Sequence, residues 1–353
     1  MAVKTIPWKA VAIVSTATSI VLALVLPVCC YRPRLPFLPN RAPAARIPLI
    51  GTEPIPTPSE AAAKASTETE MHNVAFHIDE TTVLDIHHLR GEMVSKKAGT
   101  PVNFDNKLTF ILRIDTGRIG MRSSSLDNLM NRYVFAYPNP PLRNLQMTIS
   151  GRQLVQRGII HQFVDLPFTM WADVSASRGM IRIHPTKMDI AGINGISLLK
   201  LFGQTMEKRL KLPRDRGVFA EGNDLLLDPV KILPPPQTEL KLVDVRIEGD
   251  ELVQVFDSGR HLPPLHPRHP QEKNWMYYRG GTLRMGKLLM VDADMQVVDT
   301  DPSDPFDFYI DRYNDQLVAG FDRNQPNYGL LVFMRDFDDL GTPLKAREKW
   351  APE

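Results

Sequence analysis

One charge-free segment near the N-terminus places the strongest limit on how this chain can fold. Residues 10–30, AVAIVSTATSIVLALVLPVCC, carry no charged side chain and follow Lys4 and Lys9. A helix that rises about 1.5 Å per residue needs roughly 18–20 residues to cross a hydrocarbon core. The run is longer than the usual apolar core of a signal peptide, about 7–15 residues, and no small-x-small site closes it. We therefore predict an uncleaved membrane anchor over residues 1–30, with a cleaved signal peptide as the alternative.

The orientation of this anchor is less strongly determined. Basic residues flank both sides of the run, and more of them follow it than precede it. Charge counting alone would keep the C-terminal part in the cytoplasm. Long domains are often translocated regardless of nearby charge, so we favour a single-pass protein with an extracytoplasmic, periplasmic body. The two cysteines, Cys29 and Cys30, lie at the membrane edge, so no disulfide is expected in the body.

Proline spacing divides the rest of the chain. Of the 30 prolines, many recur every few residues in 31–70, which predicts a semi-rigid tether. The body then divides into residues 71–256 and a C-terminal extension, 257–353, with added strands and a helix. The net charge of +2 provides no concentrated cationic surface, which argues against nucleic-acid binding.

Hydrophobic periodicity predicts strands and two amphipathic helices in the body. Alternating apolar residues in KLTFILRID (107–115) and DLPFTMWADV (165–174) indicate strands with one buried face. SSSLDNLMNRYVF (123–135) has helical spacing with serines as the expected N-cap, and GISLLKLFGQTMEKRL (195–210) is the second helix. Because strands and helices do not alternate one for one, the order favours an α+β fold with a long antiparallel sheet.

Two similar stretches raise the question of a metal. EGNDLLLDP (221–229) and EGDELVQVF (248–256) each place acids and a glycine before an apolar run. Gly-Asn and Gly-Asp suit the two-residue loop of a type I′ or II′ hairpin. A calcium loop would need oxygen ligands at alternate positions and a distal glutamate, which neither stretch has. We predict that both are folding turns.

Three segments in this order carry a resemblance to a known family. They are RGMIRIHPTKMDIAGINGISLLKLFG, RGVFAEGNDLLLDPVKILPPP and VDVRIEGDELVQVF. Over roughly residues 108–256 the chain resembles the bacterial LmeA-like phospholipid-binding proteins of the tubular lipid-binding (TULIP-like) group. The resemblance implies a curled antiparallel sheet that wraps a long amphipathic helix and leaves an apolar groove. The anchor, the tether and the C-terminal extension depart from that pattern.

The resemblance implies a phospholipid or fatty acyl chain as the ligand, bound near a membrane. Burial of each CH₂ group contributes about 0.8 kcal/mol, so a long tail needs no precise polar contact. The expected lipid-binding residues lie on the two predicted helices and one strand. They are Leu126, Leu129, Met130, Tyr133, Phe168, Met170, Ile196, Leu199, Phe202, Met206 and Leu210.

Two clusters in the C-terminal extension could suggest metals. HLPPLHPRHP (261–270) holds three histidines, but prolines separate them and no acidic or cysteine partner lies within the run, so we favour a proline-rich surface loop over a zinc site. Asp299, Asp301, Asp304 and Asp307 lie before or at the start of a predicted helical face at 306–317. A helix N-terminus favours negative charge and explains these acids without calcium.

No catalytic signature is found in the sequence. G-x-S-x-G, H-E-x-x-H, a Walker loop and a G-x-G-x-x-G after a strand are all absent. We therefore expect no catalytic residues, no cofactor and no bound metal. Three hypotheses remain: a membrane-anchored lipid-binding module, which we favour, a non-enzymatic envelope scaffold with a filled core, and a metal-dependent hydrolase.

Overall fold

The computed structural model describes residues 66–161, 164–195, 205–209, 212–325 and 328–341. The chain divides into two units, Met1–Pro56 and Thr57–Glu353, and every described residue belongs to the second. The predicted anchor and most of the predicted tether therefore lie outside the described residues. Within the described part, no helix combines the length and the apolar character needed to cross a membrane.

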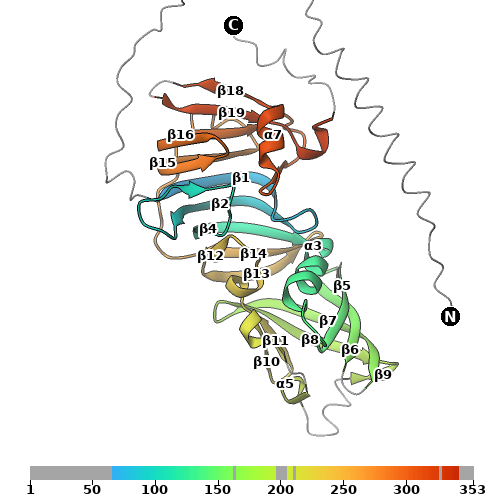
Figure 1. Ribbon diagram of the computed structural model, residues 1–353. Coiled ribbons are helices and arrows are strands. Elements are labelled where there is room, and N and C mark those ends of the chain that lie inside the picture. The colour runs from blue at the N-terminus through green and yellow to red at the C-terminus, as the bar shows by residue number, and fades with distance from the viewer. Residues whose placement is uncertain (1–65, 162–163, 196–204, 210–211, 326–327, 342–353) are drawn as a thin grey trace, which may run out of the picture. The chain divides into compact units, whose positions relative to one another are not determined.

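The larger of two sheets has 12 strands among the described residues, and most pairs of adjacent strands in it are antiparallel (Figure 1). Nine strands form its main path, and three pair at its sides. In spatial order the nine are β13 (Leu242–Glu248), β14 (Glu251–Asp257), β4 (Phe110–Arg122), β2 (Val83–Ser95), β1 (Thr67–His77), β15 (Trp275–Met285), β16 (Leu288–Asp299), β19 (Leu330–Met334) and β18 (Phe321–Asn324). The side strands are β12 (Gln237–Glu239) on β4, β17 (Phe306–Tyr309) on β1 and β3 (Val102–Asn103) on β15.

The smaller sheet has seven strands within the described ranges and is antiparallel throughout. In spatial order its strands are β10 (Val218–Glu221), β11 (Asp224–Leu227), β8 (Met180–Ile190), β7 (Asp165–Ser177), β6 (Gln153–His161) and β5 (Leu142–Ser150), with β9 (Ile193–Asn194) on β8. The predicted strand at 165–174 is confirmed. Phe168, Met170 and Ala172 are buried at alternate positions of β7, although Leu166 is exposed.

The described helices are all short, which corrects the predicted α+β class to a mostly-β one. They are α3 (Ser123–Asn128), its π-helical continuation η2 (Leu129–Val134), α5 (Met206–Arg209), α6 (Pro229–Ile232), α7 (Tyr313–Ala319) and the 3₁₀ turns η3 (Arg214–Arg216) and η5 (Phe337–Asp339). The prediction of antiparallel sheet is confirmed. The predicted single curled sheet around a helix is wrong, because the strands divide between two sheets and neither curls.

The first predicted helix is present, but its beginning differs from the expectation. Arg122 occupies the N-cap position, and no side chain caps the helix. Ser125 is used elsewhere, since its hydroxyl accepts the Val83 backbone N–H at 3.0 Å. The buried face that the apolar spacing predicts is confirmed, since Leu126 and Leu129 are both buried.

Both predicted hairpin turns are confirmed. Glu248 pairs with Glu251 at the end of the β13–β14 hairpin, which leaves Gly249 and Asp250 as the two-residue loop. Gly249 has φ +61°, and Gly222 holds the same φ in the β10–β11 hairpin. The second loop residue has no positive φ in either turn, which is the pattern of type II′. These acidic glycine stretches therefore fold strands back on one another.

The alternation of core-facing and outward-facing side chains is interrupted in both of the neighbouring strands β1 and β2, at positions that lie side by side. Met71 and Val74 in β1 both face the core, as do Ile86 and Leu89 in β2, although three residues rather than two or four separate the members of each pair. Asn73, between the first two, has φ +51°, and the register of β2 against β4 shifts just after Ile86. Bulges of this kind re-aim side chains. Here they put two consecutive residues of each strand outside the core.

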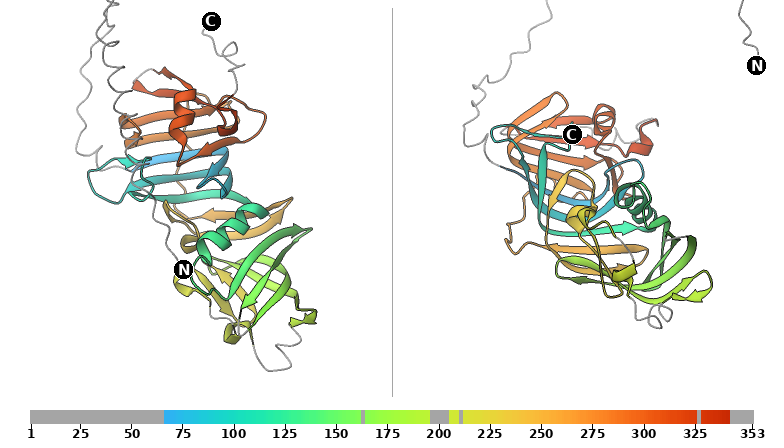
Figure 2. Two further views of the ribbon diagram at one scale, coloured as in Figure 1. Left: turned by 45° about the vertical axis from the view of Figure 1, so that its right-hand side comes forward. Right: turned by 60° about the horizontal axis from the view of Figure 1, so that its bottom comes forward.

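The C-terminal strands continue the sheet that the N-terminal strands begin. β15 pairs with β1, and β16 and β19 follow it, as the orange and red strands beside the blue ones show in Figure 2. The predicted helical face at 306–317 is only partly correct. Phe306 and Phe308 are buried at alternate positions of β17, and α7 begins only at Tyr313. The acids at 299–307 therefore do not form a helix N-terminus.

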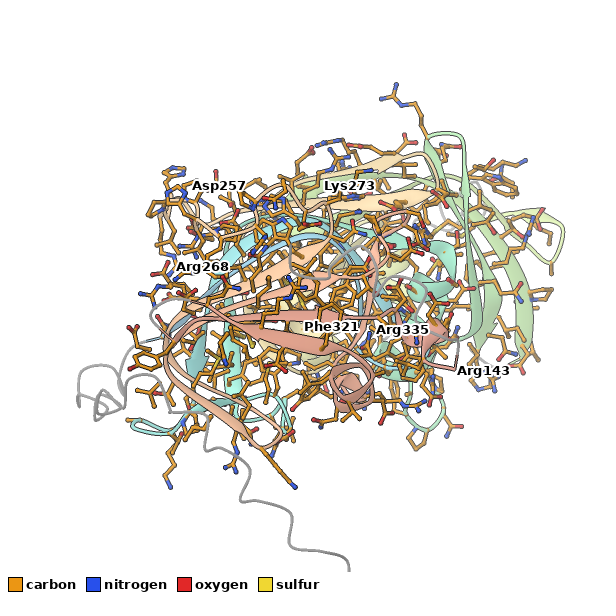
Figure 3. The ribbon with its side chains drawn as sticks, turned by 90° about the horizontal axis from the view of Figure 1, so that it is seen from above. Arg143, Asp257, Arg268, Lys273, Phe321 and Arg335 are labelled. Atoms are coloured by element: carbon orange, nitrogen blue, oxygen red, sulfur yellow. The ribbon has the colours of Figure 1, made fainter. Side chains whose placement is uncertain are left out.

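A long connection crosses the face of the larger sheet that points away from its core, called the outer face below. This crossover segment, residues 258–274, joins β14 to β15 and so has to pass β4, β2 and β1. Figure 3 labels Asp257, the last residue of β14, and Arg268 and Lys273 within the segment. Polar side chains from successive strands bond to its backbone. Leu262 N donates to Asp115 Oδ2 of β4 at 2.7 Å, Arg90 Nε of β2 to Pro263 O at 2.9 Å, Leu265 N to Glu70 Oε2 of β1 at 2.7 Å, and Gln296 Nε2 of β16 to His269 O at 2.9 Å.

Candidate functional site

An apolar cavity lies on the core side of the larger sheet. Its walls come from β1, β2, β4 and β14 and from residues 233–240, and its volume is about 40 Å³. Phe76, Ile86, Leu89 and Ile114 are among the lining residues. Since a cavity needs about 10–15 Å³ to hold one water, this space has room for only a few molecules of the size of water.

A second apolar cavity adjoins the first. It has a volume of about 20 Å³ and is lined from both sheets, for example by Met121 and Ile183. Leu233 and Gln254 line both cavities. These two side chains therefore belong to the walls of both spaces, as Ile232 of α6 does to the second and residues 233–240 in part to the first.

Two polar side chains lie in this apolar lining. Thr238 is buried, and its hydroxyl has no hydrogen bond among the described residues. Gln254 is 4% exposed and lines both cavities. Buried polar groups normally have a partner in protein, water or ligand. An apolar space with a few unpaired polar groups is typical of a small-molecule site.

The structure brings together some of the predicted lipid-binding residues. Leu126, Leu129 and Met130 are buried in α3 and η2 and line the second cavity. Tyr133 points elsewhere, because its hydroxyl donates to Asp79. Burial, together with that carboxylate, raises the pKa of Tyr133 to about 12.

The other predicted residues fall into two groups. Phe168, Met170 and Met206 are buried, but they line neither apolar cavity. The remaining four lie outside the described residues, and they are Ile196, Leu199, Phe202 and Leu210.

A larger hollow of about 500 Å³ opens beside α3 and the start of β5. Two polar groups of its wall have structural roles. The Asn131 carboxamide donates to Leu145 O at 2.6 Å and accepts the Leu145 N–H at 2.9 Å. Asp127 accepts the Met147 N–H.

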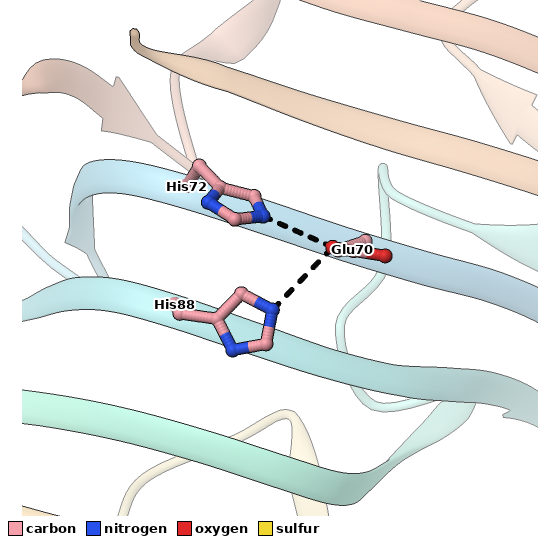
Figure 4. A group of neighbouring side chains, drawn as sticks. All are labelled: Glu70, His72 and His88. Atoms are coloured by element: carbon pink, nitrogen blue, oxygen red, sulfur yellow. Dashed lines mark hydrogen bonds and ion pairs between the residues drawn. The ribbon is translucent and has the colours of Figure 1, made fainter. Parts of the chain in front are cut away.

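A cluster of one carboxylate and two imidazoles lies on the outer face of the larger sheet (Figure 4). Glu70 and His72 are two residues apart on β1, so they share a face, and His88 of β2 pairs directly with His72. Glu70 Oε1 lies 3.0 Å from His72 Nε2 and 3.4 Å from His88 Nε2. Donor atoms of the three side chains lie within 4.8 Å of one another.

The surroundings hold this cluster in place. His72 stacks on Trp275 with ring centroids 4.3 Å apart, and His88 lies 4.6 Å from His72. Burial acts to raise the pKa of Glu70, but hydrogen bonds from His72, His88 and the Leu265 N–H outweigh it and lower the pKa to about 2. Glu70 is therefore an ionised carboxylate at neutral pH.

A second ionisable group of interest is a pair of buried carboxyls at the end of β16. Burial and the charge of Asp336 raise the pKa of Asp299 to about 8. Burial and the charges of Asp304 and Asp307 raise the pKa of Asp336 to about 7. Asn274 links Asp299 to the loop that follows β16, since its Nδ2 donates to Asp299 Oδ2 at 2.8 Å and to the backbone carbonyls of Asp301 and Asp304.

Sequence reasoning missed the cluster of Glu70, His72 and His88. A Glu-x-His pair in a strand is a usable signal, because both side chains share one face. The third member could not be found in this way. His87 and His88 would face opposite sides of a regular strand, and only the bulge and the β1–β2 register bring His88 beside His72.

Comparisons with protein-family models, with curated proteins and with solved structures found no match.

Proposed function

We propose that the protein is a membrane-anchored lipid-binding module that holds an acyl chain between the larger sheet and residues 229–240. The observation that carries the proposal is the pair of adjoining apolar cavities, which share Leu233 and Gln254 in their walls. The unpaired Thr238 hydroxyl and the Gln254 carboxamide in the cavity walls would suit the carbonyl or hydroxyl of a fatty acid or phospholipid.

The proposal requires an outward movement of the covering segment. Cavities of about 40 and 20 Å³ are too small for an acyl chain in the closed conformation. Each CH₂ removed from water contributes about 0.8 kcal/mol, so a tail of a dozen carbons could offset the displacement of the short α6 and residues 233–240.

The cellular setting belongs to the same proposal. A single-pass anchor within residues 1–30, followed by the Pro-rich tether, would keep the module close to a bilayer on the periplasmic side. The relationship to the tubular lipid-binding group rests on the sequence resemblance and is part of this proposal.

Lipid content measured together with thermal stability tests the proposal. The protein used comprises residues 57–353, which form a separate compact unit. It lacks the predicted anchor, which would itself carry lipid. We expect mass spectrometry of the extracted protein to find fatty acid or phospholipid, and phosphatidylglycerol vesicles to transfer lipid to stripped protein. Leu233→Trp should fill the junction of the cavities and lower the bound lipid at least about 10-fold, while the melting temperature stays near that of the wild type.

Val243→Trp is the matched control, since Val243 is an exposed residue on β13. It adds the same ring without touching the cavities and should keep the lipid. Wild-type protein that carries no lipid and takes none from vesicles would contradict the proposal.

The scaffold hypothesis is the second candidate, and the small volume of the cavities favours it. A nearly filled interior is what an envelope scaffold with an ordinary core requires. In that case Leu233→Trp would overpack the core and destabilise the domain, with no lipid in either protein.

A further inference from the structure

We propose that Glu70, His72 and His88 form a mononuclear site for a divalent transition metal of the zinc class on the outer face of the larger sheet. This site is independent of the proposed lipid-binding interior. Met71, between the first two ligands, faces the apolar cavity, so the two sites lie on opposite sides of one strand.

The spacing of the donor atoms fits a tetrahedral ion. With metal–ligand bonds of about 2.0–2.2 Å, neighbouring ligand atoms around zinc lie about 3.3–3.6 Å apart. Glu70 Oε1 is 3.0 and 3.4 Å from the two imidazole Nε2 atoms, and all three donor atoms lie within 4.8 Å of one another. A metal therefore needs only small movements of side chains that already point at one another (Figure 4).

The ligand set also fits. Two histidines and one glutamate, with a fourth position left to water, are a known set for zinc, and imidazole nitrogen suits this ion better than it suits calcium or magnesium. The histidine side chains are 36% and 38% exposed, whereas Glu70 is 7% exposed. A metal held here would be anchored by a buried carboxylate and still be open to solvent on the histidine side.

The crossover segment orients the carboxylate. Glu70 Oε2 accepts the Leu265 N–H at 2.7 Å, which leaves Oε1 facing the histidines. Bonds of this kind from outside the ligand set fix the direction of a ligand and sustain affinity. Arg90 lies 3.9 Å from Glu70 Oε2, but its charge is shared with Glu68, to which it donates from its other end.

Two neighbouring histidines offer a matched comparison. The bulge in β2 sends both His87 and His88 to the outer face, but His87 Nε2 bonds to Glu251 Oε2 at 2.7 Å and does not join the cluster. The same substitution at these two positions therefore removes an imidazole inside the cluster in one case and outside it in the other.

The test is a zinc titration of the full chain in detergent after treatment with a chelator. Cys29→Ser and Cys30→Ser form the background for every protein, so that the two thiols cannot bind the metal. We expect one equivalent of Zn²⁺ by calorimetry, and a tetrahedral absorption spectrum with Co²⁺ in its place. His88→Asn and Glu70→Gln should each weaken binding at least about 10-fold, and His87→Asn should leave it unchanged.

Each remaining outcome decides against the proposal. No binding by the background protein overturns it, and so does equal binding by the His88→Asn and His87→Asn proteins. If Glu70→Gln does not fold, the comparison rests on His88→Asn. That ring is half exposed, so its replacement should preserve the far-UV circular dichroism.

Discussion

At the scale of single residues, buried acids give this protein an uncommon response to pH. Asp299 is 3% exposed, and its pKa of about 8 lies well above its ordinary value of 3.8. Between those pH values the folded protein holds a proton that the unfolded chain has released. The free energy of unfolding therefore falls as pH rises through this range.

We predict that the stability decreases by a few kcal/mol as pH rises from about 5 to 9. The pKa of Asp336, raised to about 7, acts in the same direction. The side chain of an Asp299→Asn variant cannot ionise, so the stability of this variant should change less with pH. An asparagine has one acceptor oxygen where the carboxyl has two, so the variant should lose one hydrogen bond and be less stable than the wild type at acidic pH. Urea denaturation at several pH values measures both effects.

Asp322→Asn is the control for this series, because Asp322 is exposed on β18. It should follow the wild-type dependence on pH. If the stability of the wild type instead rises between about pH 5 and 9, the raised pKa values assigned to Asp299 and Asp336 are contradicted.

At the scale of elements, the hairpins depend on single glycines. An added Cβ on Gly249 would have no other atom within 4 Å, so its φ of +61° is the reason that glycine is needed. We predict that Gly249→Val destabilises the protein by about 1–3 kcal/mol through backbone strain alone. Chemical denaturation measures this loss.

Asp250→Asn tests the same turn from its other residue. The Asp250 side chain is 83% exposed, and asparagine suits the same position, so the stability should hardly change. A large loss of calcium affinity in this variant would instead support the metal interpretation of the loop.

At the scale of the whole molecule, the crossover segment joins distant parts of the chain. Asp115 is fully buried, and hydrogen bonds from Ser258 and from the Leu262 N–H lower its pKa, although burial acts to raise it. Four of the 17 residues of this segment are prolines, which have no backbone N–H, so the N–H groups of Leu262 and Leu265 are important for its attachment.

We predict that Asp115→Ala destabilises the protein by about 2–4 kcal/mol, since it leaves buried donors of the crossover segment without a partner. Urea denaturation gives the magnitude. Hydrogen exchange should show faster exchange at Leu262 and Leu265. Asp322→Ala removes an exposed carboxylate and should change neither measurement; a similar loss of stability in both variants would argue against this role for Asp115.

Local patterns in the sequence were enough for the features that depend on neighbouring residues. Gly249 and Gly222 were enough to predict the two hairpins, because the positive φ of a two-residue loop depends only on the residues of the loop itself. Alternation at Phe168 and Met170 indicated a strand for the same reason. The sequence also placed Leu126 and Leu129 on one buried face, although it did not foresee that α3 would be so short.

Only the tertiary structure decided which residues from distant segments meet. The phase change at Asn73, the bulge before His88 and the pairing of β1 with β15 are properties of strand register, which no single strand contains. A shift of one residue would send His88 to the core face and separate it from Glu70. The sequence by itself determined the turns and the apolar faces, whereas long-range pairing brought the Glu70 cluster and the two cavities together.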